Sequence, residues 1–139
     1  MTARSTEKSF PRDLDALDEI CEFVEECLEQ EGIRGSNVHW ADFVVQELFT
    51  NMVKYSRGGR HEIAVKLRAE ADRVIIEITD FDVDAFDVTK LPAVDIDQWV
   101  KEDRVGGLGI HLIRQIADTI SYEYENRNST VTVTTRVQH

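Results

Sequence analysis

The chain is organised around the stretch Val105-Gly106-Gly107-Leu108-Gly109-Ile110-His111, which joins a long acidic segment to an amphipathic one. Glycine lets backbone N–H groups approach an anion without interference from Cβ. The start of a helix adds unpaired N–H groups and a positive dipole end. The stretch therefore predicts a phosphate-binding turn, although a plain hinge before a helix would have the same composition.

The composition indicates a single domain, residues 1–139, with enough apolar content (42% hydrophobic) for a core. The formal charge of -11 disfavours a nucleic-acid backbone or an anionic membrane surface as partner. No basic region is joined to an apolar run near the N-terminus, so we expect a cytoplasmic protein. Cys21 and Cys27 match neither metal-ligand nor disulfide spacing, and we expect them to be core thiols.

The first part of the chain predicts a short edge strand over residues 5–10 and a helix from Asp13 to Gln30 that Gly32 ends. The apolar positions of this helix recur at spacings of three and four: Leu14, Leu17, Cys21, Val24 and Leu28. A second helix is expected over residues 37–55, with Ser36 or Asn37 as its cap.

Two polar residues interrupt the apolar arc of this second helix. Glu47 and Asn51 lie one turn apart and project between Phe43 and Val44. Burying either group without a partner would cost about 1 to 3 kcal/mol. The sequence therefore predicts a partner for both side chains, either the protein's own backbone or a ligand.

The next two patterns are those of strands. Ile63, Val65 and Leu67 alternate with charged residues, and after a hairpin at 70–72 a second strand runs from Val74 to Asp80. Strict alternation puts Asp80 on the apolar face of that strand. Its carboxylate either caps the following turn or contacts a ligand.

The remainder predicts a lid of about residues 82–105, a helix over 108–118 and two closing strands, 121–125 and 130–137. A short helix in the lid would use Leu91, Val94, Ile96, Trp99 and Val100, and the helix after the lid would bury Leu108, Leu112, Ile113, Ile116 and Ala117. The order of elements indicates an α+β two-layer sandwich, a mostly antiparallel sheet with helices on one face.

Taken together, these motifs resemble the GHKL ATPase superfamily of gyrase and histidine kinases. The chain is most similar to the small anti-sigma factor serine/threonine kinases, which regulate bacterial transcription by partner switching. Residues 47–55 look like the N box, Asp80 like the adenine-binding aspartate, and residues 106–111 like the second glycine box. The start, Phe10-Pro11-Arg12-Asp13-Leu14, is also similar. P-loop, dinucleotide and protein-kinase signatures are absent from the sequence.

The resemblance implies ATP and Mg²⁺ as cofactors and a role for each matching residue. Asn51 would coordinate Mg²⁺, Glu47 would act as general base, and Asp80 would bind the adenine amino group. The phosphates would be held by Gly106, Gly107, Leu108 and Gly109, with Lys54 or Arg104 neutralising charge. The implied partners are a sigma factor and an anti-sigma antagonist protein whose serine or threonine is phosphorylated; whether the chain also forms a homodimer stays open.

One departure from the family pattern concerns the turn after Asp80. The family has D-x-G-x-G there, whereas this chain has Asp82 and Asp84 at the two glycine positions. Aspartate adopts left-handed geometry more easily than most residues, but two added carboxylates oppose the binding of a triphosphate. The sequence therefore leaves an alternative open, a degenerate module that sequesters its partner without kinase activity.

Overall fold

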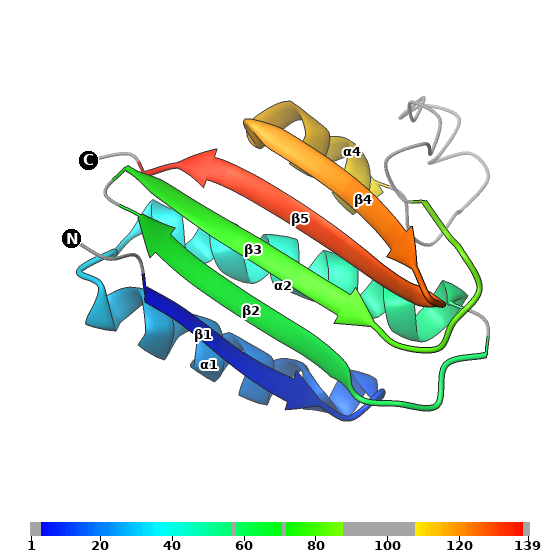
Figure 1. The fold of residues 1–139 in the computed structure, drawn as a ribbon. Coiled ribbons are helices and arrows are strands. Elements are labelled where there is room, and N and C mark those ends of the chain that lie inside the picture. Colours follow the sequence, from blue (N-terminus) through cyan, green and yellow to red (C-terminus); the bar gives the residue numbers. More distant parts are fainter. Residues whose placement is uncertain (1–3, 57, 71, 88–107, 138–139) are drawn as a thin grey trace, which may run out of the picture.

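The fold is a five-stranded antiparallel sheet with helices packed on one face (Figure 1). The computed structural model describes residues 4–56, 58–70, 72–87 and 108–137. The elements follow in the order β1 (Arg4–Phe10), a 3-10 turn (Leu14–Ala16), α1 (Leu17–Gln30), α2 (Ser36–Tyr55), β2 (Ile63–Glu70), β3 (Arg73–Asp80), α4 (Leu108–Ile116), β4 (Thr119–Glu125) and β5 (Asn128–Arg136). The strand order is β1-β2-β3-β5-β4. This confirms the predicted α+β two-layer architecture.

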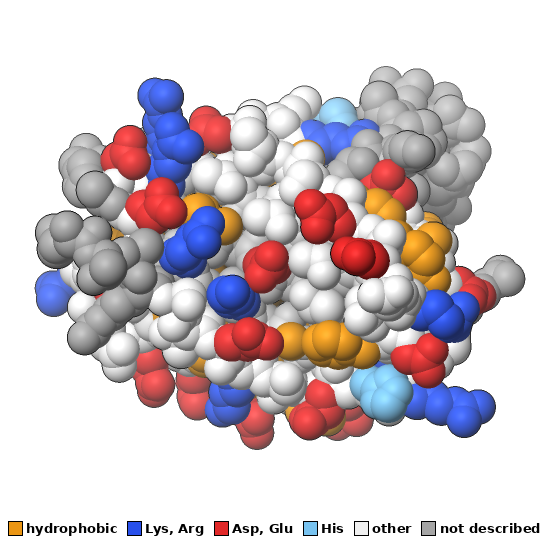
Figure 2. Space-filling view, in the orientation of Figure 1, with side chains coloured by type: hydrophobic (Ala, Val, Ile, Leu, Met, Phe, Trp, Pro, Cys, Tyr) orange, Lys and Arg blue, Asp and Glu red, His pale blue; other side chains and the backbone are white. Residues whose placement is uncertain are grey.

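The sheet separates an apolar face from a polar one. Along β3, burial alternates residue by residue, and Val74, Ile76 and Ile78 lie in the core under the helices. The opposite face carries charged side chains of both signs (Figure 2). Lys66 of β2 and Glu77 of β3 form an ion pair, with Nζ and Oε2 3.9 Å apart. β1 pairs with β2 from Arg4↔Ala69 to Phe10↔Ile63, which confirms the predicted edge strand.

The start of the first helix differs from the prediction. The chain enters it through a 3-10 turn at Leu14–Ala16, where Asp13 caps the N–H of Asp15 at 2.9 Å. The buried Ala16 of this turn continues into α1 through Ile20, Val24 and Leu28, a row with a spacing of four residues. As a result Leu14 is 38% exposed, and Ile20 is fully buried where Cys21 had been expected.

The start of α2 also corrects the prediction. Gly35, rather than Ser36 or Asn37, is its N-cap, and no side chain caps the helix. The carbonyl of Gly35 accepts hydrogen bonds from the N–H groups of Val38 and His39, at 3.1 and 3.3 Å. Gly35 has φ of 70°, which a residue with a side chain adopts only with strain.

The helix α4 is shorter than predicted, and its inward face agrees with the prediction only in part: Ile113 is buried and Ala117 packs against the core, as expected. Ile110 and Ile113 are buried, whereas Leu112 and Ile116, which were expected in the core, are 36% and 50% exposed. The part of α4 that contacts the core is therefore narrow and consists of residues three positions apart, Ile110 and Ile113, because the helix packs chiefly against α2. No helix among the described residues is long and apolar enough to cross a membrane.

The hairpin of β4 and β5 begins and ends close to the predicted positions. Asn126 and Arg127 both have positive φ, 54° and 63°. Two such residues between antiparallel strands form the turn whose twist matches that of the strands. Because Asn128 already belongs to β5, the turn is one residue shorter than expected.

A carboxyl pair, the buried Asp42 of α2 and the exposed Glu25 of α1, lies between these two helices. Asp42 is 8% exposed, and its Oδ1 has no hydrogen-bond partner. Burial, a hydrogen bond with Glu25 and the negative charge of Glu25 raise the pKa of Asp42 from 3.8 to about 7. Asp42 is therefore protonated over part of the pH range in which the unfolded chain has already lost that proton.

This pair makes folding stability fall as the pH rises. Between pH 3.8 and about 7 the folded chain binds more protons at Asp42 than the unfolded chain, so the stabilisation is complete below this range and lost above it. We expect Asp42→Asn to remove this contribution and to stabilise the protein more at pH 8 than at pH 5. Urea unfolding across that range measures the difference, with the exposed Glu22→Gln as control. A difference between wild type and Asp42→Asn that is constant with pH would contradict the prediction.

Candidate functional site

The second helix and the start of α4 meet at Glu47 and Gly109. A Cβ atom added to Gly109 would lie 2.6 Å from Cγ of Glu47 and closer still to its carboxylate. No real Cβ atom lies that close to another carbon, so only glycine allows α4 to pass Glu47 in this way. Glu47 and Gly109, which the sequence analysis named as candidate site residues, are thus in contact although they lie 62 positions apart in the chain.

The surroundings of Glu47 favour a carboxylate that can accept a proton. Its side chain is partly buried, and burial raises the pKa of its carboxyl group. The ammonium of Lys54, two helical turns further along α2, acts in the opposite direction. A raised pKa brings a carboxylate closer to neutral pH, where a general base is most effective.

Asn51 follows Glu47 by one turn of α2. It is 5% exposed, and its Nδ2 atom is buried without a hydrogen-bond partner. An amide whose hydrogen bonds the protein does not complete is costly, which fits a side chain reserved for a ligand. A rotation of the amide exchanges its oxygen and nitrogen, so the oxygen can serve as one of the few protein ligands that Mg²⁺ needs beside phosphate oxygens.

Asp80 ends β3 and is fully buried. Its Oδ1 accepts a hydrogen bond from the guanidinium of Arg12, whereas its Oδ2 has no partner. Burial raises the pKa of Asp80, and Arg12, Ser56 and the backbone N–H of Phe81 oppose that rise. The prediction that Asp80 points inward is confirmed, and its buried Oδ2 leaves one acceptor unsatisfied.

The turn after Asp80 carries the two aspartates that replace glycines. Asp82 has φ of 53°, so it adopts the left-handed backbone expected of glycine. Arg127, in the β4–β5 turn, contacts both carboxylates: its Nε lies 2.9 Å from Asp82 Oδ1 and its Nη1 lies 3.3 Å from Asp84 Oδ1. The hydrogen bond from Arg127 lowers the pKa of Asp82. This pairing places one positive charge beside the two aspartates, on the exposed surface of the turn.

Hydrogen bonds connect the same turn to the hairpin of β4 and β5. The N–H of Val83 donates to the carbonyl of Arg127 at 2.9 Å, and the Tyr124 hydroxyl donates to the carbonyl of Val83 at 2.7 Å. Phe86 donates its N–H to the hydroxyl of Tyr122 at 3.1 Å and stacks on Tyr55. Sequence analysis missed these anchors, because nothing local to residues 81–87 indicates the β4–β5 hairpin as their partner.

Several predicted residues lie outside the described part of the chain. These are Arg104, Gly106 and Gly107, together with the lid segment from residue 88 onward and the short helix expected in it. Leu108 is the first residue of α4. The described residues hold no group of three or more His, Cys, Asp or Glu side chains suited to a metal ion.

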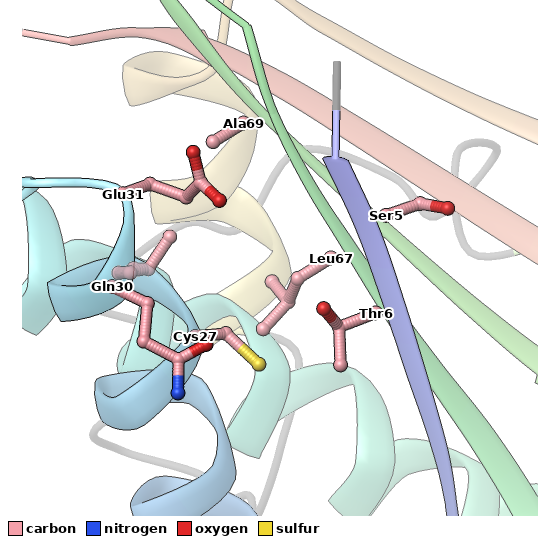
Figure 3. Close-up of a pocket in the computed structure, with 8 residues that line it drawn as sticks. Ser5, Thr6, Cys27, Gln30, Glu31, Leu67 and Ala69 are labelled. Atoms are coloured by element: carbon pink, nitrogen blue, oxygen red, sulfur yellow. The ribbon is translucent and has the colours of Figure 1, made fainter. Parts of the chain in front are cut away.

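A separate cavity of about 220 Å³ lies between the sheet and the end of α1 (Figure 3). It is lined by Ser5, Thr6, Cys27, Leu28, Gln30, Glu31, Leu67 and Ala69. Cys27 is free and half-buried, as is Cys21, and burial raises the pKa of both thiols. Raised values keep a thiol protonated and unreactive. The register of β2 and β3 places this cavity at the end of the sheet remote from Asp80.

The class of protein follows from a comparison with known families. Residues 10–135 match the family model of the histidine kinase-like ATPase domain. The chain therefore belongs to the histidine kinase-like ATPase domain family. The matched region includes Glu47, Asn51, Asp80 and Gly109, the described residues that the sequence predicts for the site.

Individual proteins similar to the chain include kinases. The sensor histidine kinase YxdK of Bacillus subtilis is 24% identical over 104 residues, which are 68% of this chain and 30% of that kinase. The chain thus spans about a third of the curated relative that it matches. A chain of the SiaB–SiaC complex from Pseudomonas aeruginosa has a TM-score of 0.61 at 15% identity, covering 95% of this chain and 89% of that one.

A second solved structure has a similar fold. The histidine kinase AdeS of Acinetobacter baumannii has a TM-score of 0.51 at 18% identity, and the match covers 98% of this chain and 70% of that one. At these identities the similarity of both structures is a similarity of fold. It confirms the histidine-kinase-like architecture predicted from the sequence.

Proposed function

We propose that this chain is a cytoplasmic anti-sigma factor that binds Mg-ATP and phosphorylates a serine or threonine of an antagonist protein. The observation that carries the proposal is the contact between Glu47 and Gly109. It puts a carboxylate with a raised pKa beside the start of the helix whose N-terminal glycines would hold phosphate.

Each residue of the site has a role in the proposed reaction. The hydroxyl oxygen of the antagonist forms a bond to the γ-phosphorus, the bond from that phosphorus to the β-γ bridging oxygen breaks, and ADP leaves. Glu47 accepts the proton of the hydroxyl. Asn51 contributes the protein oxygen to Mg²⁺, which neutralises charge on the phosphates. Asp80 accepts a hydrogen bond from the exocyclic amine of adenine.

A second candidate function is sequestration of a partner without phosphoryl transfer. Asp82 and Asp84 favour it, since carboxylates close to a triphosphate weaken binding. The pairing of both with Arg127 supports the kinase instead, because it supplies a counter-charge within the protein. The similarity to a chain of the SiaB–SiaC complex supports a partner protein under either proposal.

Transfer of radiolabelled γ-phosphate tests the proposal. The purified chain is mixed with labelled ATP, Mg²⁺ and the candidate antagonist encoded beside its gene. Label is expected on a serine or threonine of the antagonist, and none in a reaction with Asn51→Ala. If the antagonist binds the chain tightly and remains unlabelled, the sequestering module is the better description.

Replacing Gly109 tests the position of Glu47. Alanine is the better helix former by about 1 kcal/mol, so Gly109→Ala should not unfold the protein. Its Cβ would instead displace the flexible end of Glu47. Displacement of a catalytic group by about 1 Å costs on the order of 10²-fold in rate, and we expect a loss of this size in phosphoryl transfer.

A double variant provides the control for this experiment. If Gly109→Ala acts through Glu47, it should cause little further loss of transfer in a Glu47→Gln background. Thermal unfolding of the single variant should occur at or above the wild-type temperature. Transfer by Gly109→Ala at the wild-type rate would contradict the prediction.

A further inference from the structure

Arg12 is held at the end of β3 by three contacts. Its guanidinium pairs with Asp80 through one nitrogen, and another nitrogen donates to the carbonyl of Met52 at 3.0 Å. Gly59 packs so closely that a Cβ added there would lie 2.7 Å from Arg12 Nε. The Arg12 side chain is only 14% exposed. Because these three contacts hold the Arg12 side chain in place, we include Arg12 in the candidate site.

The contact with Arg12 makes the two carboxylate oxygens of Asp80 differ in their hydrogen bonding. Oδ1 is engaged by the guanidinium, while Oδ2 is buried without a partner. A carboxylate held in this way presents one acceptor in a fixed direction. This suits a single donor N–H of a ligand, and it suits a ligand carbonyl poorly.

We propose that Arg12 is a positioning residue that holds Oδ1 of Asp80 and leaves Oδ2 as the acceptor for the base, and that it thereby makes the site select an amino purine over an oxo purine. This inference rests on the proposed function, because it takes Asp80 to be the group that contacts the base. Arg12 touches no part of the nucleotide in this account and acts through Asp80 alone.

The charge of Arg12 matters because, among the described residues that shift the pKa of Asp80, Arg12 is the one that carries a charge. Ser56 follows α2, the backbone N–H of Phe81 follows β3, and Ser129 of β5 pairs with Asp80 across the sheet. All three are uncharged, and Arg12 is the charged group that opposes the effect of burial on the pKa of Asp80. Without Arg12, Asp80 would protonate more readily, and a protonated carboxyl can donate to a carbonyl.

Calorimetric titration with Mg-ADP and Mg-IDP tests the inference. The bases of ADP and IDP differ at one position, where adenine has an amine and hypoxanthine a carbonyl. We expect wild type to bind ADP at least about tenfold more tightly than IDP. In Arg12→Met this preference should fall toward equality, and ADP binding should weaken further as the pH is lowered from 8 to 6.

Three further variants distinguish the proposed role of Arg12 from an unspecific disruption of the structure. Arg12→Lys restores a charge but not both contacts, so it should recover part of the preference. Gly59→Ala keeps the arginine and displaces it, and should lower the preference if Arg12→Met does not fold. Arg73→Met removes an exposed arginine from the other end of β3 and should bind like wild type.

The outcomes are distinguishable. If wild type binds neither nucleotide, the proposed function fails and the inference fails with it. If wild type prefers ADP and Arg12→Met loses affinity equally for both nucleotides at every pH, Arg12 is merely structural and only the inference fails. Tighter binding of ADP by Arg12→Met would show that Arg12 obstructs the base, which also overturns the inference.

Discussion

Glu47→Gln is expected to lower the rate of phosphoryl transfer about 10³-fold, the usual contribution of a general base. Glutamine keeps the shape of the side chain that packs against Gly109, so the site should keep its geometry. It cannot accept the proton of the attacking hydroxyl. Affinity for Mg-ATP should change little, because Glu47 contacts the hydroxyl rather than the nucleotide in this account.

The pH dependence of transfer should identify the same residue. Burial raises the pKa of Glu47, with Lys54 opposing the rise. The wild-type rate should therefore fall with acid at a pH above the ordinary range of glutamate, as the carboxylate becomes protonated. In Glu47→Gln the rate of transfer should no longer fall with acid. The control Glu62→Gln, which changes an exposed residue, should keep both the wild-type rate and its fall at low pH. Transfer by Glu47→Gln at the wild-type rate would show that another group accepts the proton.

Asp80→Asn is expected to weaken Mg-ADP binding about 10²-fold, since a charge-assisted hydrogen bond to a buried acceptor is lost. It should also destabilise the fold by about 3 kcal/mol, because Arg12 is left nearly buried without its counter-charge. Calorimetry measures the first effect and urea unfolding the second. The loss of affinity reports on the contact between Asp80 and the base, and the loss of stability reports on the ion pair between Asp80 and Arg12.

A matched control lies at the other end of the same strand. Asp72 precedes β3, is exposed and pairs with Arg73 at 3.8 Å. Asp72→Asn should therefore leave both nucleotide affinity and stability close to wild type, since exposed ion pairs contribute little. If Asp80→Asn bound Mg-ADP as tightly as Asp72→Asn, Asp80 would not be the base-contacting group.

The layers of the fold could be predicted from the sequence because their patterns are local. The period-two burial of β3 and the position of Asp80 at its end needed only residues 74–80. The predicted apolar face of α1 was wrong at Leu14 and Cys21, because the buried row runs through Ala16 and Ile20 to Val24 and Leu28 instead. The exposure of Leu112 and Ile116 depends on how narrowly α4 contacts its neighbours, which the local pattern does not contain.

The candidate site was predictable as a set of residue types but not as a set of contacts. Arg12 meets Asp80 across 68 positions, and Arg127 meets Asp82 across 45. Both pairs depend on the order of strands in the sheet and on which turns lie side by side. The sequence therefore suggested that Asp82 and Asp84 oppose a phosphate without indicating Arg127 as their counter-charge.

Titration of the chain with Mg-ATP in a calorimeter tests the central claim most directly, since the claim is that Glu47, Asn51, Asp80 and the start of α4 form one nucleotide site. The account predicts saturable binding at one site per chain, weakened when EDTA removes Mg²⁺ and weakened about 10²-fold in Asp80→Asn. No heat of binding at millimolar Mg-ATP, or binding of the same strength in Asp80→Asn, would contradict it.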